Sequence, residues 1–172
     1  MLKRFGRVRS VLDLGAGTAD LLDSIPGDLL RIAVDFKIEH LLYLRERSKA
    51  RRVVADALDL PFRNASVDVI TSSHFFHHFN PETNAVILRE SRRVARRGVA
   101  FTDTRRHYLP LLFTLFLGAF RLVGRITRSD APGSIRRGYT VDEARRIAAM
   151  VDPAQASIVK LFPFRFGIIL EK

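Results

Sequence analysis

The chain has no cysteine among its 172 residues. This absence excludes structural disulfides, thiolate catalysis and cysteine-ligated zinc, and it is typical of a protein in the reducing cytoplasm, where we expect this one. A signal peptide is also absent from the start of the chain, because the first apolar run ends at the charged Asp13 and lacks a small-residue cleavage site. No Gly/Ser-rich linker, repeat or low-complexity stretch divides the sequence, so a single domain over residues 1–172 is predicted.

Acidic residues are scarce relative to basic ones. The chain has 29 Lys and Arg against 18 Asp and Glu, which gives a formal net charge of +11. Such a charge attracts polyanions, so a nucleic acid has to be considered as a partner. The arginines are, however, spread through every predicted helix, and no aromatic residues are interleaved with them to stack bases. A nucleic-acid partner is therefore disfavoured, and methylation of RNA is kept only as a weaker alternative.

The most informative segment is residues 11–20, in which an apolar strand leads into a turn with two glycines and then into a helix start. Gly15 can turn the chain at positive φ, and Gly17 lets backbone N–H groups approach a ligand closely. A third glycine or alanine, which the dinucleotide-binding fingerprint requires, is missing, because Asp20 stands in its place. This segment predicts a nucleotide-binding loop and disfavours a nicotinamide-dependent oxidoreductase.

Acidic residues follow the next two predicted strands. Residues 30–35 form an apolar strand that ends in Asp35, a position from which a carboxylate can accept both hydroxyls of a ribose. Asp35 can equally cap a helix that begins near Lys37. A third strand over 52–55 is followed by Asp56 and Ala57.

The second half of the chain continues the alternation of strands and helices. A fourth strand over 66–71 leads to a stretch with three histidines, and helical spacing over 81–95 predicts a helix that Gly98 closes. A fifth strand is expected over 99–102. Thr140-Val141-Asp142-Glu143 predicts a capping box at the start of a helix, and two apolar runs, 156–162 and 166–170, predict a final antiparallel pair.

These motifs, in this order and spacing, resemble class I S-adenosylmethionine-dependent methyltransferases. The likeness is greatest to small bacterial enzymes of the ubiquinone and menaquinone biosynthesis type, through residues 101–106, the apolar segment after them and 136–140. The resemblance implies an α/β fold: a Rossmann-like, doubly wound, mostly parallel seven-stranded sheet with an antiparallel last strand and helices on both faces. It implies S-adenosylmethionine as cofactor and a small lipophilic acceptor of the phenolic, polyketide or quinone-like kind.

The resemblance also implies the cofactor-binding residues. Asp35 is assigned to the ribose, while the Asp56 side chain and the Ala57 N–H are assigned to the adenine. The full predicted set is Asp13, Gly15, Ala16, Gly17, Asp35, Phe36, Asp56, Ala57, Ser72 and Ser73.

Candidate catalytic residues are His77 and His78, because the stretch after the fourth strand faces the methyl group in this family. A neutral imidazole can remove the proton of a phenol as it attacks. The alternative is that these histidines only hydrogen-bond the backbone and shape the pocket. Predicted acceptor-binding residues are His74, Arg105, His107 and Tyr108. No metal site is expected, since no carboxylate lies at ligand spacing from the histidine pair.

An uncharged apolar segment, 108–120, lies where the family places substrate-recognition insertions, and 104–139 is predicted as such an insertion or lid. The segment is too short to span a bilayer. It forms a wall of the acceptor pocket, a peripheral contact with the inner face of the membrane, or an ordinary buried helix. Residues 124–139 are expected to be a mobile loop.

The first strand starts close to Val8, so the N-terminal helices that usually cover the cofactor and acceptor are missing from this sequence. The pocket is then unusually open, is closed by a partner chain such as a second copy in a homodimer, or belongs to a shortened form with weak activity. A non-catalytic cofactor-binding or membrane-associated module is therefore the main alternative to an enzyme.

Overall fold

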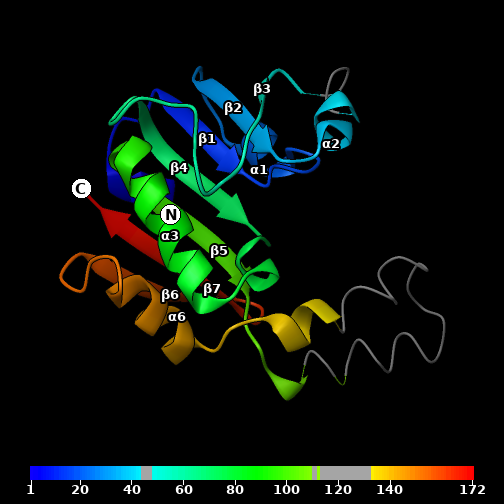
Figure 1. Cartoon of the computed structure of the whole chain (residues 1–172), viewed down its shortest axis with the longest axis vertical. Helices are drawn as coiled ribbons and strands as arrows, with labels where there is room; N and C mark the ends of the chain where they lie inside the picture. The colour runs from blue at the N-terminus through cyan, green and yellow to red at the C-terminus, as the bar shows by residue number, and fades with distance from the viewer. Residues whose placement is uncertain (44–47, 110–111, 113–132) are drawn as a thin grey trace.

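A single mixed sheet organises the computed structural model, which describes residues 1–43, 48–109, 112 and 133–172. Its strands are hydrogen-bonded in the order β3-β2-β1-β4-β5-β7-β6 (Figure 1). β7 pairs antiparallel with both β5 and β6, whereas the other pairs are parallel. The strands are β1 (Ser10–Leu14), β2 (Leu30–Asp35), β3 (Arg51–Val54), β4 (Val67–Ser73), β5 (Ala95–Thr104), β6 (Ala156–Leu161) and β7 (Arg165–Glu171).

Helices cover both faces of this sheet. On one face, Leu12 of β1 packs in a cluster with Ile87 of α3, and on the other, Val11 packs in a cluster with Leu22 of α1. Right-handed crossovers give this result, because the chain leaves β1 toward one sheet edge and leaves β4 toward the other. The helices are η1 (Leu2–Phe5), α1 (Asp20–Ser24), α2 (Ile38–Tyr43), η3 (Phe76–His78), α3 (Pro81–Val94) and α6 (Val141–Ala149).

The predicted fold class is confirmed, as are most of the predicted elements. The capping box is present at α6: the Glu143 N–H donates to Thr140 Oγ1 at 3.2 Å, and the Thr140 N–H donates to the Glu143 carboxylate at 2.8 Å. Both faces of the central strands are covered, so β1 and β4 are buried along nearly their whole length, polar residues such as Asp13 and Thr71 included. β1 runs parallel to both β2 and β4. The carboxyl ends of β1, β2 and β4 therefore meet at one edge of the sheet.

The prediction that Gly98 closes the helix before β5 is wrong. α3 ends at Val94, and β5 begins at once with Ala95. Gly98 lies inside the strand with φ +153°, where a Cβ atom would come within 2.2 Å of the Leu170 carbonyl oxygen and 2.6 Å of the Phe5 ring. Glycine is needed here because η1 and β7 press against β5 from two sides.

The expected mobile loop over 124–139 is wrong at its end, since residues 133–137 are helical. The buried Ile135 anchors this turn, and the Gly138 N–H donates to the Ser134 carbonyl at 2.9 Å. Of the apolar segment 108–120, the described residues Tyr108, Leu109 and Leu112 are exposed, and the others lie outside the described residues. The described helices include none with the length and apolar character to cross a membrane.

A hollow of about 530 Å³ lies over β4 and β5 on the same side of the sheet as α1. Its wall is formed by the N-terminal residues, α1 and the segment after α1, and its floor by Thr71, Ser72, Ala100 and Thr102. The sequence also predicts that the N-terminal helices that usually cover the cofactor and acceptor are missing. That absence stays a prediction.

We expect Gly98→Ala to destabilise the protein by about 2–3 kcal/mol, because the new Cβ overlaps backbone of β7 that cannot move without breaking the sheet. Gly27→Ala is the matched control: Gly27 also has positive φ, +99°, but nothing lies within 4 Å of its Cβ position. That control should lose only about 1 kcal/mol. Urea unfolding measures both, and equal losses would contradict the overlap with Leu170 as the cause.

Candidate active site

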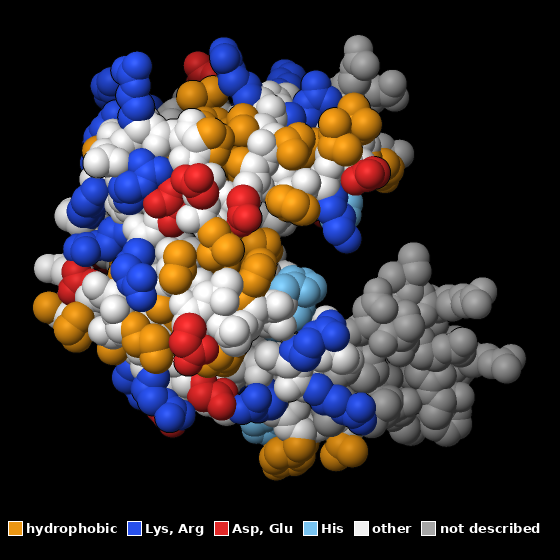
Figure 2. Space-filling model, viewed as in Figure 1, with side chains coloured by type: hydrophobic (Ala, Val, Ile, Leu, Met, Phe, Trp, Pro, Cys, Tyr) orange, Lys and Arg blue, Asp and Glu red, His pale blue; other side chains and the backbone are white. Residues whose placement is uncertain are grey.

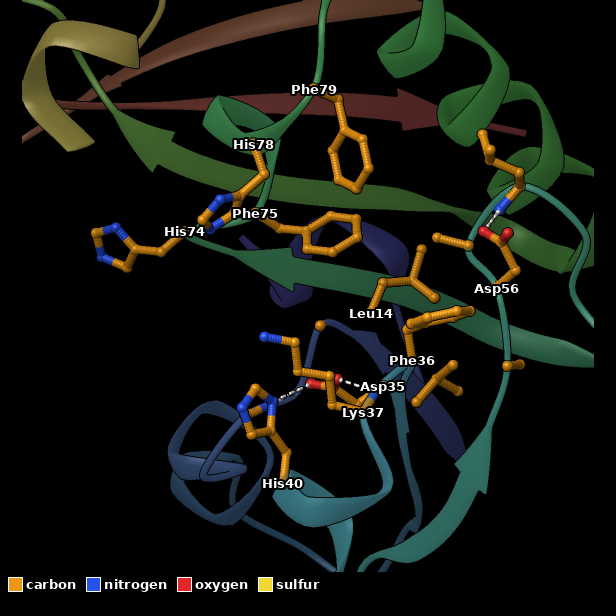
Figure 3. A pocket seen from close by; sticks show the side chains of 16 residues that line it. Leu14, Asp35, Phe36, Lys37, His40, Asp56, His74, Phe75, His78 and Phe79 are labelled. Carbon is orange, nitrogen blue, oxygen red and sulfur yellow. Dashed lines mark hydrogen bonds and ion pairs between the residues drawn. The ribbon is translucent and has the colours of Figure 1, made fainter. Parts of the chain in front are cut away.

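The principal cavity, of about 520 Å³, lies at the carboxyl ends of β1 and β2 and against the loops that follow β3 and β4 (Figure 3). This is the edge at which doubly wound sheets bind their ligands. Figure 2 shows a deep hollow on the viewed face, with hydrophobic and histidine side chains on its wall and Lys or Arg on both lips. The lining consists of Leu14, Gly15, Gly17, Val34, Asp35, Phe36, Lys37, His40, Ala55, Asp56, Ala57, Leu58, His74, Phe75, His78 and Phe79.

The glycine loop after β1 needs both of its glycines. Gly15 has φ +63°, and a Cβ there would lie 2.4 Å from the Phe75 ring. Gly17 has φ +49°, and its N–H donates to Asp35 Oδ2 at 3.2 Å. The loop is thus held between an aromatic ring from the β4 side and a carboxylate from β2.

Asp35 is fixed by three donors. Its Oδ1 accepts from the Lys37 N–H at 2.9 Å, and its Oδ2 accepts from Gly17 and lies 3.1 Å from His40 Nδ1 (Figure 3). Asp35 therefore accepts the Lys37 N–H just before α2 and also lines the cavity, and its binding to a ligand stays a prediction. Sequence reasoning missed His40, although a histidine in the first turn of the helix after such an acid can reach back to it.

Another part of the cavity lining suits a flat base. Phe36 is 74% exposed although it is a large aromatic residue beside the cavity. Asp56 faces the same space, and its Oδ1 accepts the Leu58 N–H at 2.9 Å, which fixes the turn that presents Ala57. Apolar side chains, a fixed carboxylate for ribose hydroxyls and a second carboxylate for an amine form a set that fits an adenosine group.

The two candidate catalytic histidines lie in different environments. His77 is buried, and its Nδ1 lies 2.9 Å from Asp103 Oδ1, while its own N–H donates to Asp103 Oδ2 at 3.0 Å. Burial raises the pKa of Asp103, but its hydrogen bonds and the charge interaction with His77 outweigh this effect and lower the pKa below its ordinary value. Only His78 lines the cavity, with its ring centroid 4.2 Å from that of His77.

His78 and His74 are both held toward the neutral form. Partial burial lowers the pKa of each imidazole, and electrostatic interactions, with His77 for His78 and with Arg165 for His74, lower it further. His74 has φ +56° and its Nδ1 lies 3.2 Å from Thr104 Oγ1. In Figure 3 these two rings lie at the end of the cavity away from Asp56.

Several predicted cofactor residues lie outside the cavity lining. Ser72 is buried and donates to the Leu14 carbonyl at 2.8 Å, and Ser73 accepts from Arg165 at 2.9 Å. Ala16 contributes to the loop through its N–H, which donates to the Val34 carbonyl. Asp13 is buried in β1, where it accepts a hydrogen bond of 2.8 Å from Thr71.

The predicted acceptor residues after β5 form a separate cluster. The His107 ring stacks on Tyr108 with centroids 4.6 Å apart and lies 5.1 Å from the Phe164 ring. The Arg105 guanidinium lies 5.7 Å from the same Phe164 ring. None of the three lines the principal cavity, and their role in acceptor binding stays a prediction.

The strand order and the cavity at the glycine loop define a Rossmann-like protein. A family model described as "Methyltransferase domain" matches residues 12–102, more than half of the chain, so the chain belongs to this methyltransferase family. A demethylmenaquinone methyltransferase from Roseiflexus sp. (strain RS-1) is 38% identical over 109 residues, which are 59% of this chain and 45% of that protein. The chain thus spans less than half the length of this relative.

Solved structures share the fold at low sequence identity. A SAM-dependent methyltransferase from Aquifex aeolicus is 20% identical with a TM-score of 0.68, and the match covers 99% of this chain and 86% of that one. The plantazolicin methyltransferase BpumL, in complex with a triazolic desmethylPZN analog and SAH, is 12% identical with a TM-score of 0.73, covering 99% and 80%. The predicted resemblance to class I methyltransferases is confirmed.

Asp13 is expected to oppose folding at neutral and higher pH. Burial raises its pKa to about 7, with the Thr71 hydrogen bond acting in the opposite direction. The unfolded carboxyl ionises near pH ~4, so stability is lost as the pH rises from there to about 7. Asp13→Asn keeps an acceptor for Thr71 without the charge. It should therefore raise the melting temperature by several degrees at about pH 8 and by less at about pH 5.

Asp68→Asn is the matched control, because its effect on stability should depend on pH in the opposite direction. Asp68 is buried too, but its hydrogen bonds with the Arg9 and Ser10 N–H groups and with Arg96 outweigh burial and lower its pKa. Its charge contributes stability above the unfolded pKa, and that contribution is lost as the pH falls. Asp68→Asn should therefore cost more at about pH 8 than at low pH. Parallel pH dependences for the two variants would contradict the assignment.

Proposed function

We propose that this protein transfers a methyl group from S-adenosylmethionine to a small lipophilic acceptor of the phenolic, polyketide or quinone-like kind. The observation that carries the proposal is one cavity with a carboxylate, Asp35, on its wall and an imidazole of lowered pKa, His78, at its far end. Family membership and the relative that acts as a demethylmenaquinone methyltransferase support it.

The chain's own residues would hold the cofactor as follows. Asp35 would accept hydrogen bonds from the ribose, the Asp56 side chain and the Ala57 N–H would face the adenine, and the glycine loop would border the amino-acid part. S-adenosylmethionine supplies a methyl group that is already activated on a sulfonium sulfur. The protein therefore has mainly to align the acceptor atom with that methyl group, and the fixed walls of the cavity provide this alignment.

Proton removal from a hydroxyl acceptor falls to His78. It lines the cavity, and its lowered pKa leaves the ring neutral and able to accept a proton at pH 7. His77 acts as a positioning residue, since Asp103 holds its Nδ1 and its ring packs against His78. His78 thus receives the proton of the acceptor, His77 packs against His78, and Asp103 holds His77 in place.

We expect Asp35→Ala to weaken binding of S-adenosylhomocysteine by about tenfold to a hundredfold, because hydrogen bonds to a charged group are lost. Asp28→Ala, at an exposed aspartate in the loop before β2, should leave the affinity unchanged. Titration calorimetry with NAD as a negative control measures both. Unchanged affinity in Asp35→Ala would show that the assignment of the ribose site is wrong.

We expect His78→Gln to lower kcat for a phenolic acceptor by about a hundredfold while S-adenosylhomocysteine affinity stays within twofold. The wild-type rate should fall on acidification, with a midpoint below the ordinary histidine pKa of about 6.5, because the pKa of His78 is lowered. Initial rates across the pH range test this. A pH profile that His78→Gln leaves in place would assign the base elsewhere.

A further inference from the structure

Arg165 is a partly buried cation at the edge of the sheet where the cavity lies. It begins β7, and its Nη2 donates to Ser73 Oγ at 2.9 Å and lies 3.4 Å from Thr102 Oγ1. Its Nε is buried without a hydrogen-bond partner, and no carboxylate among the described residues forms an ion pair with it. Two hydroxyl groups are thus its only polar partners within the described part of the chain.

Two other partly buried arginines have a counter-ion: Arg92 lies 2.6 Å from an Asp152 oxygen, and Arg93 lies 2.6 Å from a Glu90 oxygen. Arg31 has no carboxylate partner among the described residues, but its guanidinium donates to four backbone carbonyls. A partly buried guanidinium without an anion pays a desolvation cost that hydroxyl groups compensate only in part. The free N–H groups of Arg165 therefore form a place where an anionic ligand would be stabilised.

Arg165 and its hydroxyl partners lie outside the lining of the principal cavity, and Thr102 lines the neighbouring hollow over β4 and β5, but the contacts of Arg165 place it next to the His74 end of the cavity. Arg165 is paired with Thr104 across β5 and β7, and Thr104 Oγ1 lies 3.2 Å from His74 Nδ1. Ser73, to which Arg165 donates, directly precedes His74, which lines the cavity. After burial, the charge of Arg165 is the next largest cause of the lowered pKa of His74, as expected for close neighbours.

The groups around this end of the cavity are basic or neutral. Figure 3 shows Lys37 on the same side as His74 and His78. The nearest acid is Asp103, whose oxygens are occupied by His77 and by the Thr104 N–H at 2.6 Å. Asp103 is therefore not available to Arg165, and the local charge favours an anion.

We propose that Arg165 binds a carboxylate at the His74 end of the cavity. The planar guanidinium fork matches a carboxylate with two parallel hydrogen bonds, and Arg165 has N–H groups left for both. The inference deepens the proposed function and rests on it. Two sources share this chemistry: a carboxylate next to the methylated atom of the acceptor, and the amino-acid carboxylate of the cofactor.

Two matched pairs of probes separate the sources. S-adenosylhomocysteine and 5′-methylthioadenosine share the nucleoside and sulfur, but only the first has the amino-acid carboxylate. 1-Hydroxy-2-naphthoate and 1-naphthol differ in one carboxylate, and both are titrated into protein that is saturated with S-adenosylhomocysteine. All four are titrated by calorimetry into wild type, Arg165→Gln, Arg165→Lys and the control Arg89→Gln, which changes an exposed arginine on α3.

We expect Arg165→Gln to weaken binding of a carboxylate-bearing probe by at least about tenfold while its uncharged counterpart binds as to wild type. Arg165→Lys, which keeps the charge and loses the fork, should recover part of the loss, and Arg89→Gln should change nothing. A selective loss for S-adenosylhomocysteine places the cofactor carboxylate at Arg165. A selective loss for hydroxynaphthoate places the acceptor carboxylate there.

The inference is overturned if Arg165→Gln binds all four probes as wild type does, or if it weakens all four equally, which indicates only a structural role. If melting shows that the Gln variant does not fold, Arg165→Lys carries the test, with a loss of about threefold expected for the carboxylate members alone. Wild-type protein that binds neither nucleoside would refute the proposed function. In that case the naphthoate and naphthol pair is titrated into the free protein, and it tests whether Arg165 binds a carboxylate independently of the cofactor.

Discussion

The hydrogen bond from the Gly17 N–H to Asp35 Oδ2 joins the loop after β1 to the end of β2, and the rest of the cavity depends on it. A glycine loop at positive φ has many conformations open to it when unfolded, so holding one of them costs entropy. A charged acceptor offsets that cost better than a neutral one. The same carboxylate also accepts from Lys37, so the loop, the strand end and the start of α2 share one fixed point.

A second fixed point lies on the other side of the cavity. Asp103, at the end of β5, accepts from the N–H of His77 and from that of Thr104 and lies against the His77 ring. These contacts hold the turn after β4, which in turn places Phe75 over Gly15 and His78 at the cavity wall. The two halves of the site are therefore positioned by carboxylates from two different strands, and the sheet sets the distance between them.

Much of this arrangement could be predicted from the sequence, because the signals were local or followed from strand order. The glycine loop, Asp35 and Asp56 follow apolar strands whose carboxyl ends must meet in a parallel sheet. Gly98 was misassigned because its cause is a tertiary contact with Phe5 and Leu170, which no local pattern contains. The difference between His77 and His78 was hidden for the same reason, since only the partner Asp103, far along the chain, makes one buried and leaves the other at the cavity.

Backbone N–H groups hold several of the aspartates of this protein in place. Asp35, Asp56, Asp68 and Asp103 each accept at least one, and such donors cannot rotate away or titrate. Asp13 is the contrast, with a hydroxyl as its donor and a pKa raised to about 7. In a chain with an excess of basic residues, backbone donors hold Asp35, Asp56 and Asp103 in position without relying on an arginine partner. Such a framework is rigid before any ligand arrives, which is the condition under which alignment alone can accelerate the transfer of an activated methyl group.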